Sequence, residues 1–63
     1  MQLIVNGENR ELPEAATVAD VLGERTRGVA VAVNREVLPR SAWQSAPLRD
    51  GDRVEIVEVR QGG

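Results

Sequence analysis

Residues 29–33 alternate strictly between valine and alanine, and this stretch constrains the fold more than any other. Successive side chains of a β-strand point to opposite faces of a sheet, so the three valines share one face while Ala30 and Ala32 share the other. We therefore expect a strand whose valine face packs against a core. Its alanine face is small and flat, and is either exposed or covered by a partner.

A hairpin is predicted at the start of the chain. The first five residues are rich in apolar and β-branched side chains, with Leu3 and Val5 on one face. Asn6-Gly7 follows, and this pair is a strong hairpin signal because a type I′ turn needs positive φ at both central residues. We expect the returning strand over about residues 9–12.

A short amphipathic helix is expected next. Thr17 is a candidate N-cap, with an acidic residue three positions later as in a capping box. Of the two glycines that follow, the pattern favours Gly28 over Gly23 as the end, because arginines just before Gly28 suit the negative end of the helix dipole. The apolar stripe, spaced i, i+3 and i+4, consists of Val18, Val21 and Leu22.

The second half should return to the sheet after the valine–alanine strand. Asn34-Arg35 is expected to turn the chain into a short edge strand over residues 36–38, closed by a proline, which cannot donate to a ladder. Residues 40–49 are predicted to be irregular. Trp43, the only aromatic residue, is expected to fill the margin of the core, and a partner-binding hot spot is the alternative.

The last apolar run should form the final strand. We expect residues 50–52, Asp-Gly-Asp, to form a turn just before it. A calcium loop is not expected there, because it would need several more oxygen ligands than this sequence offers. In the final strand, Val54 and Ile56 are expected to be buried, while Val57 and Val59 face outward. A bulge that turns the second half inward is the alternative.

These elements predict an α+β domain over residues 1–59, with one helix packed on one face of a mixed sheet of four to five strands. The first and last strands should be central parallel neighbours, which is the β-grasp arrangement. The predicted core consists of Val5, Val18, Leu22, Val31, Val33, Val54 and Ile56.

Composition argues against most catalytic functions. The chain of 63 residues has no Cys, His or Tyr, and all eight basic residues are arginine, so the usual nucleophiles and proton shuttles are absent. A net charge of −2 and a single aromatic residue argue against nucleic-acid binding. No apolar stretch reaches membrane-spanning length and no signal-peptide pattern opens the chain, so we expect a cytoplasmic protein that binds no membrane.

The sequence ends in Gly62-Gly63, two residues after the last apolar run. Glycine loses more conformational freedom on folding than any other residue and brings no side chain to a core. A frayed end is one explanation. The alternative is that residues 60–63 form a thin, flexible tail, which enters a narrow channel and places the terminal carboxylate of Gly63 at its tip.

In order and spacing, these segments resemble the ubiquitin-like sulfur carriers, most closely those of thiamine biosynthesis. The related molybdopterin carriers share the tail but are usually longer. The resemblance covers nearly the whole chain and implies a ubiquitin-like β-grasp fold. The matching segments are residues 3–8, 17–22, 29–34, 37–43 and 48–57, and the terminal Gly62-Gly63.

The resemblance implies a carrier acted on by partner enzymes, not an enzyme. A ubiquitin-activating-like adenylyltransferase, using ATP and magnesium, would adenylate the carboxylate of Gly63. A persulfide sulfur donor would then replace AMP and leave a thiocarboxylate, whose sulfur thiazole synthase would accept. Arg60, Gln61 and Gly62 would be the arm that delivers it. The carrier itself would bind no metal or cofactor.

An exposed apolar patch next to the tail is the expected docking surface for these partners. It consists of Ala30, Ala32, Val57 and Val59. A sulfur carrier for molybdopterin or for another sulfur acceptor is one alternative, and two other functions stay open. A ubiquitin-like protein modifier would use the same tail but end as an amide to a lysine, whereas an RNA-binding β-grasp module would need a basic face, against which the acidic balance argues.

Overall fold

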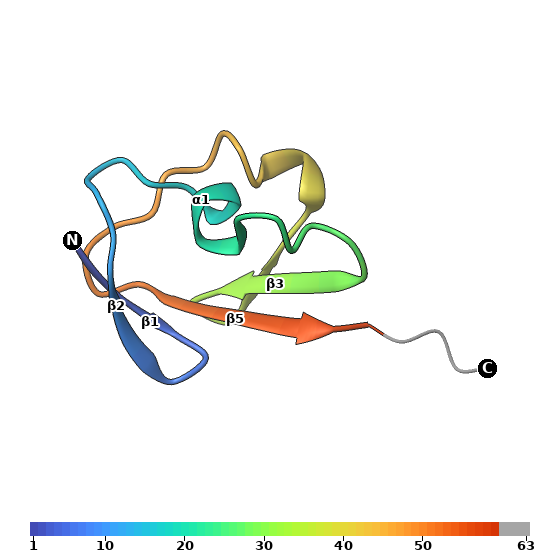
Figure 1. Cartoon of the computed structure of the whole chain (residues 1–63), viewed down its shortest axis with the longest axis horizontal. Coiled ribbons are helices and arrows are strands. Elements are labelled where there is room, and N and C mark those ends of the chain that lie inside the picture. The colour runs from blue at the N-terminus through green and yellow to red at the C-terminus, as the bar shows by residue number, and fades with distance from the viewer. Residues whose placement is uncertain (60–63) are drawn as a thin grey trace.

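The computed structural model describes residues 1–59, and the expected tail of residues 60–63 lies outside them. Five strands form one sheet in the order β2-β1-β5-β3-β4 (Figure 1). The central pair β1–β5 is parallel and the other pairs are antiparallel, so the mixed β-grasp sheet is confirmed. The strands are β1 Gln2–Val5, β2 Glu8–Glu11, β3 Val29–Val33, β4 Glu36–Leu38 and β5 Arg53–Glu58.

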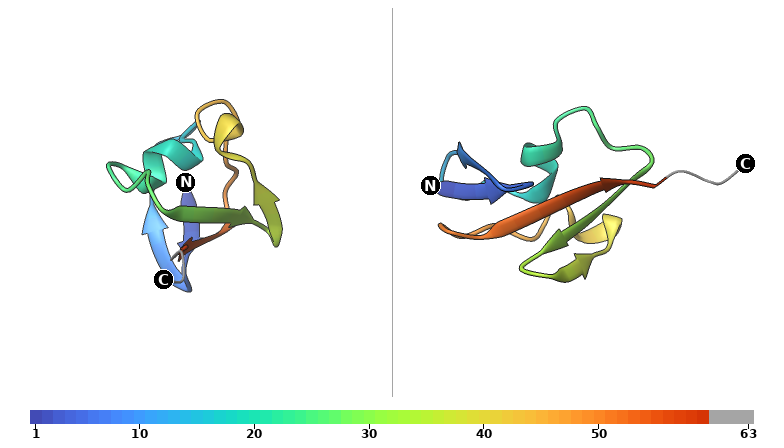
Figure 2. Two further views of the ribbon diagram at one scale, coloured as in Figure 1. Left: turned by 90° about the vertical axis from the view of Figure 1, so that its right-hand side faces the viewer. Right: turned by 90° about the horizontal axis from the view of Figure 1, so that it is seen from below.

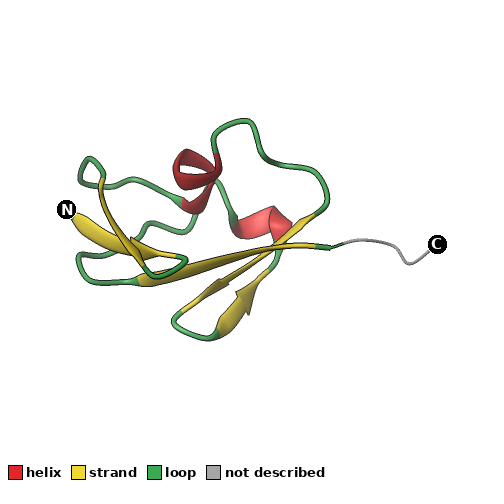
Figure 3. Cartoon of the chain, turned by 60° about the horizontal axis from the view of Figure 1, so that its bottom comes forward, coloured by secondary structure: helices red, strands yellow, loops and turns green. Residues whose placement is uncertain are grey.

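The helix α1, Val18–Leu22, and a single 3₁₀ turn η1, Arg40–Ala42, lie on the same side of this sheet (Figures 2 and 3). The core fills the space between them. Val33 and Ile56, predicted as core, are half-buried and pack against its margin. The buried residues are Leu3, Val5, Ala16, Val18, Val21, Leu22, Val31, Trp43, Leu48 and Val54.

Both tight hairpins close through a two-residue turn with positive φ. Asn6 has φ 49° and Gly7 φ 83°, as the Asn-Gly signal predicts, and Asn34 and Arg35 have φ 51° and 71°. The Asn6 side chain also accepts a hydrogen bond from the Ile56 N–H at 2.8 Å, which ties the first turn to β5. The first turn is therefore a structural element, and its sequence is explained without a ligand.

The predicted end of the helix is wrong. The helix ends at Leu22, and Gly23 follows with φ 63° and donates its N–H to the Ala19 carbonyl at 3.0 Å. The next four residues are charged or polar and all are exposed, so a longer helix would have buried nothing in the core. The start of the helix is as predicted, because the Thr17 N–H donates to the Asp20 carboxylate at 2.9 Å.

The crossover between β4 and β5 is mostly irregular, as expected, but it closes one side of the core. Trp43 is 5% exposed and its indole N–H donates to the Leu38 carbonyl at 3.0 Å. Leu48 is also buried, and its N–H donates to the Ala16 carbonyl at 2.9 Å. Burial of Trp43 confirms its place in the core and excludes it as an exposed hot spot.

The Asp-Gly-Asp sequence before β5 forms a turn, as predicted. Asp50 accepts a hydrogen bond from the Gln2 N–H at 2.7 Å, and Asp52 accepts one from the Arg49 N–H at 2.8 Å. Gly51 has φ 89°, a conformation that L side chains rarely adopt. The two carboxylates therefore fix the backbone of this turn, which positions the start of β5 beside β1.

Candidate functional site

The face of the sheet opposite α1 carries an apolar patch. Strand register pairs Ala30 with Val57 and Ala32 with Val37, so these four side chains share the outer face of β3, β4 and β5. Val57 is 59% exposed and Val37 is 78% exposed, while the two alanines are half-buried between them. The strand pairing thus assembles residues from three segments into one surface.

Val59 extends the patch toward the C-terminal end of β5. Its side chain is 56% exposed, and alternation places it on the same side of the strand as Val57. The favoured orientation of the last strand is therefore correct, and no bulge turns its second half inward. We call Ala30, Ala32, Val37, Val57 and Val59 the outer-face patch.

Val37 was not predicted as part of this surface. Its own strand is only three residues long, and a three-residue alternation does not reveal which face is buried. The signal lay in the turn at Asn34-Arg35, because a two-residue hairpin fixes the register and pairs Val37 with Ala32. Leu38 then falls on the core side, opposite Val31.

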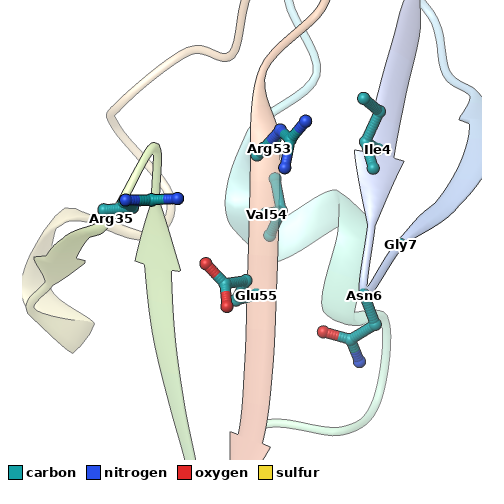
Figure 4. A pocket seen from close by; sticks show the side chains of 7 residues that line it. All are labelled: Ile4, Asn6, Gly7, Arg35, Arg53, Val54 and Glu55. Atoms are coloured by element: carbon teal, nitrogen blue, oxygen red, sulfur yellow. The ribbon is translucent and has the colours of Figure 1, made fainter.

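Charged side chains border the outer-face patch toward β1. Ile4 and Arg53 are register neighbours on the outer face, and Glu55 follows beside Ala32. Together with Arg35 in the β3–β4 turn, they line a recess next to the Asn6 turn (Figure 4). The outer face is thus apolar near the end of β5 and of mixed charge near its start.

The end of β5 is fixed against the loop between α1 and β3. Glu58 pairs with Val29, and the Val59 N–H then donates to the Gly28 carbonyl at 2.7 Å. Gly28 has φ 66°, which lets the loop turn into β3 while its carbonyl faces Val59. The C-terminal end of β5 lies at the end of the domain opposite the N-terminus (Figure 1). The predicted site residues Arg60, Gln61, Gly62 and Gly63 lie outside the described residues.

Within residues 1–59, no charged or polar side chain is buried, and no three His, Cys, Asp or Glu residues gather to hold a metal ion. No helix in this part of the chain is long and apolar enough to cross a membrane. What the described domain offers is an exposed apolar surface that reaches Val59 at the end of β5.

Comparisons with known proteins agree on one family. The profile of the ThiS family matches residues 3–63. A sulfur carrier protein ThiS from Thermus thermophilus is 45% identical, over 94% of this chain and 95% of its own length. The sulfur carrier protein ThiS of Escherichia coli K12 is 30% identical, with both chains covered in full.

A thiazole synthase from Paramagnetospirillum magneticum is 41% identical over the whole chain, which spans only 20% of that protein's length. Among solved structures, a crystal structure of the thiamine biosynthesis protein ThiS from Geobacter metallireducens superimposes with a TM-score of 0.84, 33% identity and full coverage of both chains. A solution structure of a thiamine biosynthesis protein from the same organism has a TM-score of 0.73 at 33% identity, covering this chain in full and 88% of that one. The chain therefore belongs to the ThiS family.

Proposed function

We propose that this protein is a sulfur carrier that supplies the sulfur for thiazole formation in thiamine biosynthesis. The observation that carries the proposal is the match to relatives named sulfur carrier proteins, which covers 94% or more of this chain. The match to the family includes Gly62 and Gly63. The relatives' names also favour a carrier over an enzyme, since catalysis then belongs to the partners.

The reacting group is the terminal carboxylate of Gly63. One carboxylate oxygen attacks the α-phosphorus of ATP in the adenylyltransferase, pyrophosphate leaves with magnesium, and an acyl-adenylate forms. A persulfide sulfur then attacks the acyl carbon, AMP leaves, and a thiol cleaves the S–S bond of the adduct to release the thiocarboxylate. Activation is needed because a free carboxylate is a poor electrophile. We propose the cytoplasm as the location, where ATP is available.

The domain's own contribution is to dock and to aim. The outer-face patch is an exposed apolar surface of the kind that marks interfaces, and it includes Val59, the last described residue before the C-terminal arm. From Val59 to Gly63 the chain can reach at most about 13 Å when fully extended. The nucleotide of a partner that binds the patch must therefore lie within this distance of Val59.

Thiazole synthase is the proposed sulfur acceptor. The thiazole synthase that matches this chain over a fifth of its length supports that assignment, because a carrier-like segment and the synthase occur there in one protein. Adenylyltransferase and acceptor would use the patch in turn, since each must receive the same C-terminal carboxyl group.

Deletion of Gly63 tests the proposal. The shortened chain still ends in a carboxylate, but this group lies about 3.3 Å short of the nucleotide. Because a misplacement of about 1 Å can cost a hundredfold in rate, pyrophosphate release should fall by at least about a hundredfold. Gly62→Leu, whose chain keeps its length, should fail by steric exclusion from the channel. Unchanged pyrophosphate release from the deletion variant would refute the assignment of Gly63.

A further inference from the structure

Val59 is bound to the loop between α1 and β3 at the point where the β3–β5 ladder ends. Its N–H bonds to the Gly28 carbonyl, next to the last strand pair, Val29 with Glu58, so the position of residues 24–28 bears on where the chain leaves the sheet. This loop is exposed throughout and has few backbone bonds of its own, among them the Thr26 N–H to the Glu24 carbonyl at 2.9 Å. Segments of this kind open locally at low cost unless something else fixes them.

Arg40 contacts this loop from the 3₁₀ turn. Its guanidinium donates a hydrogen bond to the Thr26 carbonyl, fourteen residues away in the chain. The same guanidinium lies over the Trp43 ring, with its central carbon 5.3 Å from the ring centroid. A cation at this distance from the face of an indole is attracted to it, so the ring and the carbonyl together define the position of the Arg40 side chain.

Trp43 in turn is anchored in the core. It is 5% exposed, and its indole N–H is bonded to the Leu38 carbonyl at the end of β4. Contacts thus link the buried Trp43 to Arg40 and Arg40 to the Thr26 carbonyl. Two residues further along the chain, the Gly28 carbonyl accepts the Val59 N–H. In this series the exposed Arg40 side chain joins the 3₁₀ turn to the loop, through its hydrogen bond to the Thr26 carbonyl.

We propose that Arg40 is a positioning residue, which holds the α1–β3 loop so that Val59 leaves the sheet in one direction and aims the carboxyl-bearing residues at the partner's nucleotide. The aiming part rests on the proposed function, whereas the effect on Val59 does not. Arg40 lies on the same side of the sheet as α1, away from the outer-face patch, so its role is separate from docking.

The experiment compares Arg40→Met with Arg49→Met. Methionine keeps an apolar stem over Trp43 but cannot donate to Thr26. Arg49 is an exposed residue in the turn before β5, at the other end of the strand from Val59, so its replacement removes the same charge as a control. Amide hydrogen exchange of Val59, measured by NMR on the isolated full-length chain, should accelerate about tenfold in Arg40→Met. Exchange in Arg49→Met should match the wild type.

A third variant separates positioning from charge alone. Arg40→Lys keeps a cation that can reach both the ring and the carbonyl, so it should restore most of the Val59 protection. If Val59 exchange is unchanged in Arg40→Met, or rises only in step with the amides of the central strands, Arg40 has no local role and the proposal is wrong.

Adenylation kinetics test the second part. With the activating enzyme, ATP and magnesium, Arg40→Met should lower kcat at least about fivefold while KM changes less than about twofold, because docking is intact and only the reacting group is misplaced. A raised KM at constant kcat would instead assign Arg40 to the docking surface and overturn the positioning role. If the wild type itself is not adenylated, the proposed function fails, and the Val59 exchange result still decides the role of Arg40 in the fold.

Discussion

Arg35 occupies a backbone conformation that arginine rarely adopts. It is the second residue of the β3–β4 turn with φ 71°, the position at which the equivalent β1–β2 turn has Gly7. A non-glycine residue in the left-handed region costs about 1–2 kcal/mol of stability relative to glycine. Part of this cost is offset, because glycine loses more conformational entropy on folding.

Adding a glycine at the β3–β4 turn and removing one from the β1–β2 turn should therefore change the free energy of unfolding in opposite directions. Arg35→Gly should raise the free energy of unfolding by about 0.5–1 kcal/mol, and Gly7→Ala should lower it by about 1 kcal/mol, since an added Cβ at Gly7 meets nothing within 4 Å and only backbone strain remains. Urea unfolding followed by circular dichroism measures both. A loss of stability in Arg35→Gly would show that its side chain, which lines the outer-face recess, contributes more than its strain costs.

The central strands hold the core of this small domain. Leu3 in β1 and Val54 in β5 are both 0% exposed and lie in the parallel pair. Leu3→Ala should lower the free energy of unfolding by about 2–5 kcal/mol through lost burial and the cavity left behind. This is a large share of the 5–15 kcal/mol typical of a domain, so thermal unfolding should show a substantially lower Tm.

Val37→Ala is the control for that loss. Val37 is the most exposed of the large apolar residues in the described chain, and its truncation should change the free energy of unfolding by no more than about 0.5 kcal/mol. Equal losses for Leu3→Ala and Val37→Ala would contradict the assignment of the core to the α1 side of the sheet.

At the scale of elements, what could be predicted follows from periodicity. The strands with clear alternation and the Asn-Gly turn were found, as were the parallel central pair and the start of the helix at Thr17. The end of the helix was missed because two glycines compete and sequence alone does not show that residues 24–27 find no core to face. Leu48 was missed as a core residue because the crossover has no period, and its burial depends on a long-range bond to Ala16.

The candidate site was predicted in part for the same reason. Val57 and Val59 follow from alternation within one strand, whereas Val37 required the register between two strands. The contacts of Arg40 could not be predicted, because they join residues 26, 40 and 43 through the folded loop and leave no local pattern.

At the scale of the whole molecule, the two faces of the sheet differ in burial. Its inner face lies under α1 and the crossover (Figures 1 and 2), and its outer face carries the outer-face patch. A change on the outer face should therefore affect partners much more than stability.

Val57→Asp tests this separation. Val57 is 59% exposed, so the substitution should cost less than about 1 kcal/mol of stability, mainly through the low strand propensity of aspartate. A desolvated charge at the centre of an apolar interface should weaken binding to the adenylyltransferase and to thiazole synthase at least about tenfold. Isothermal titration calorimetry measures both affinities. Asn9→Asp, which adds the same charge on the exposed strand β2, should leave them unchanged, and equal effects of the two variants would point to net charge instead of the patch.

The most direct test of the sulfur carrier function is the intact mass of the wild-type protein after incubation with its activating enzyme, ATP, magnesium and a persulfide donor. The mass should increase by the replacement of one oxygen by sulfur, and fragmentation should localise the change to the C-terminal peptide that contains Gly63. Adding thiazole synthase with its other substrates should return the mass to that of the carboxylate. A protein that never gains sulfur under these conditions and instead forms amides with lysines of other proteins would be a modifier, and the sulfur carrier function would be wrong.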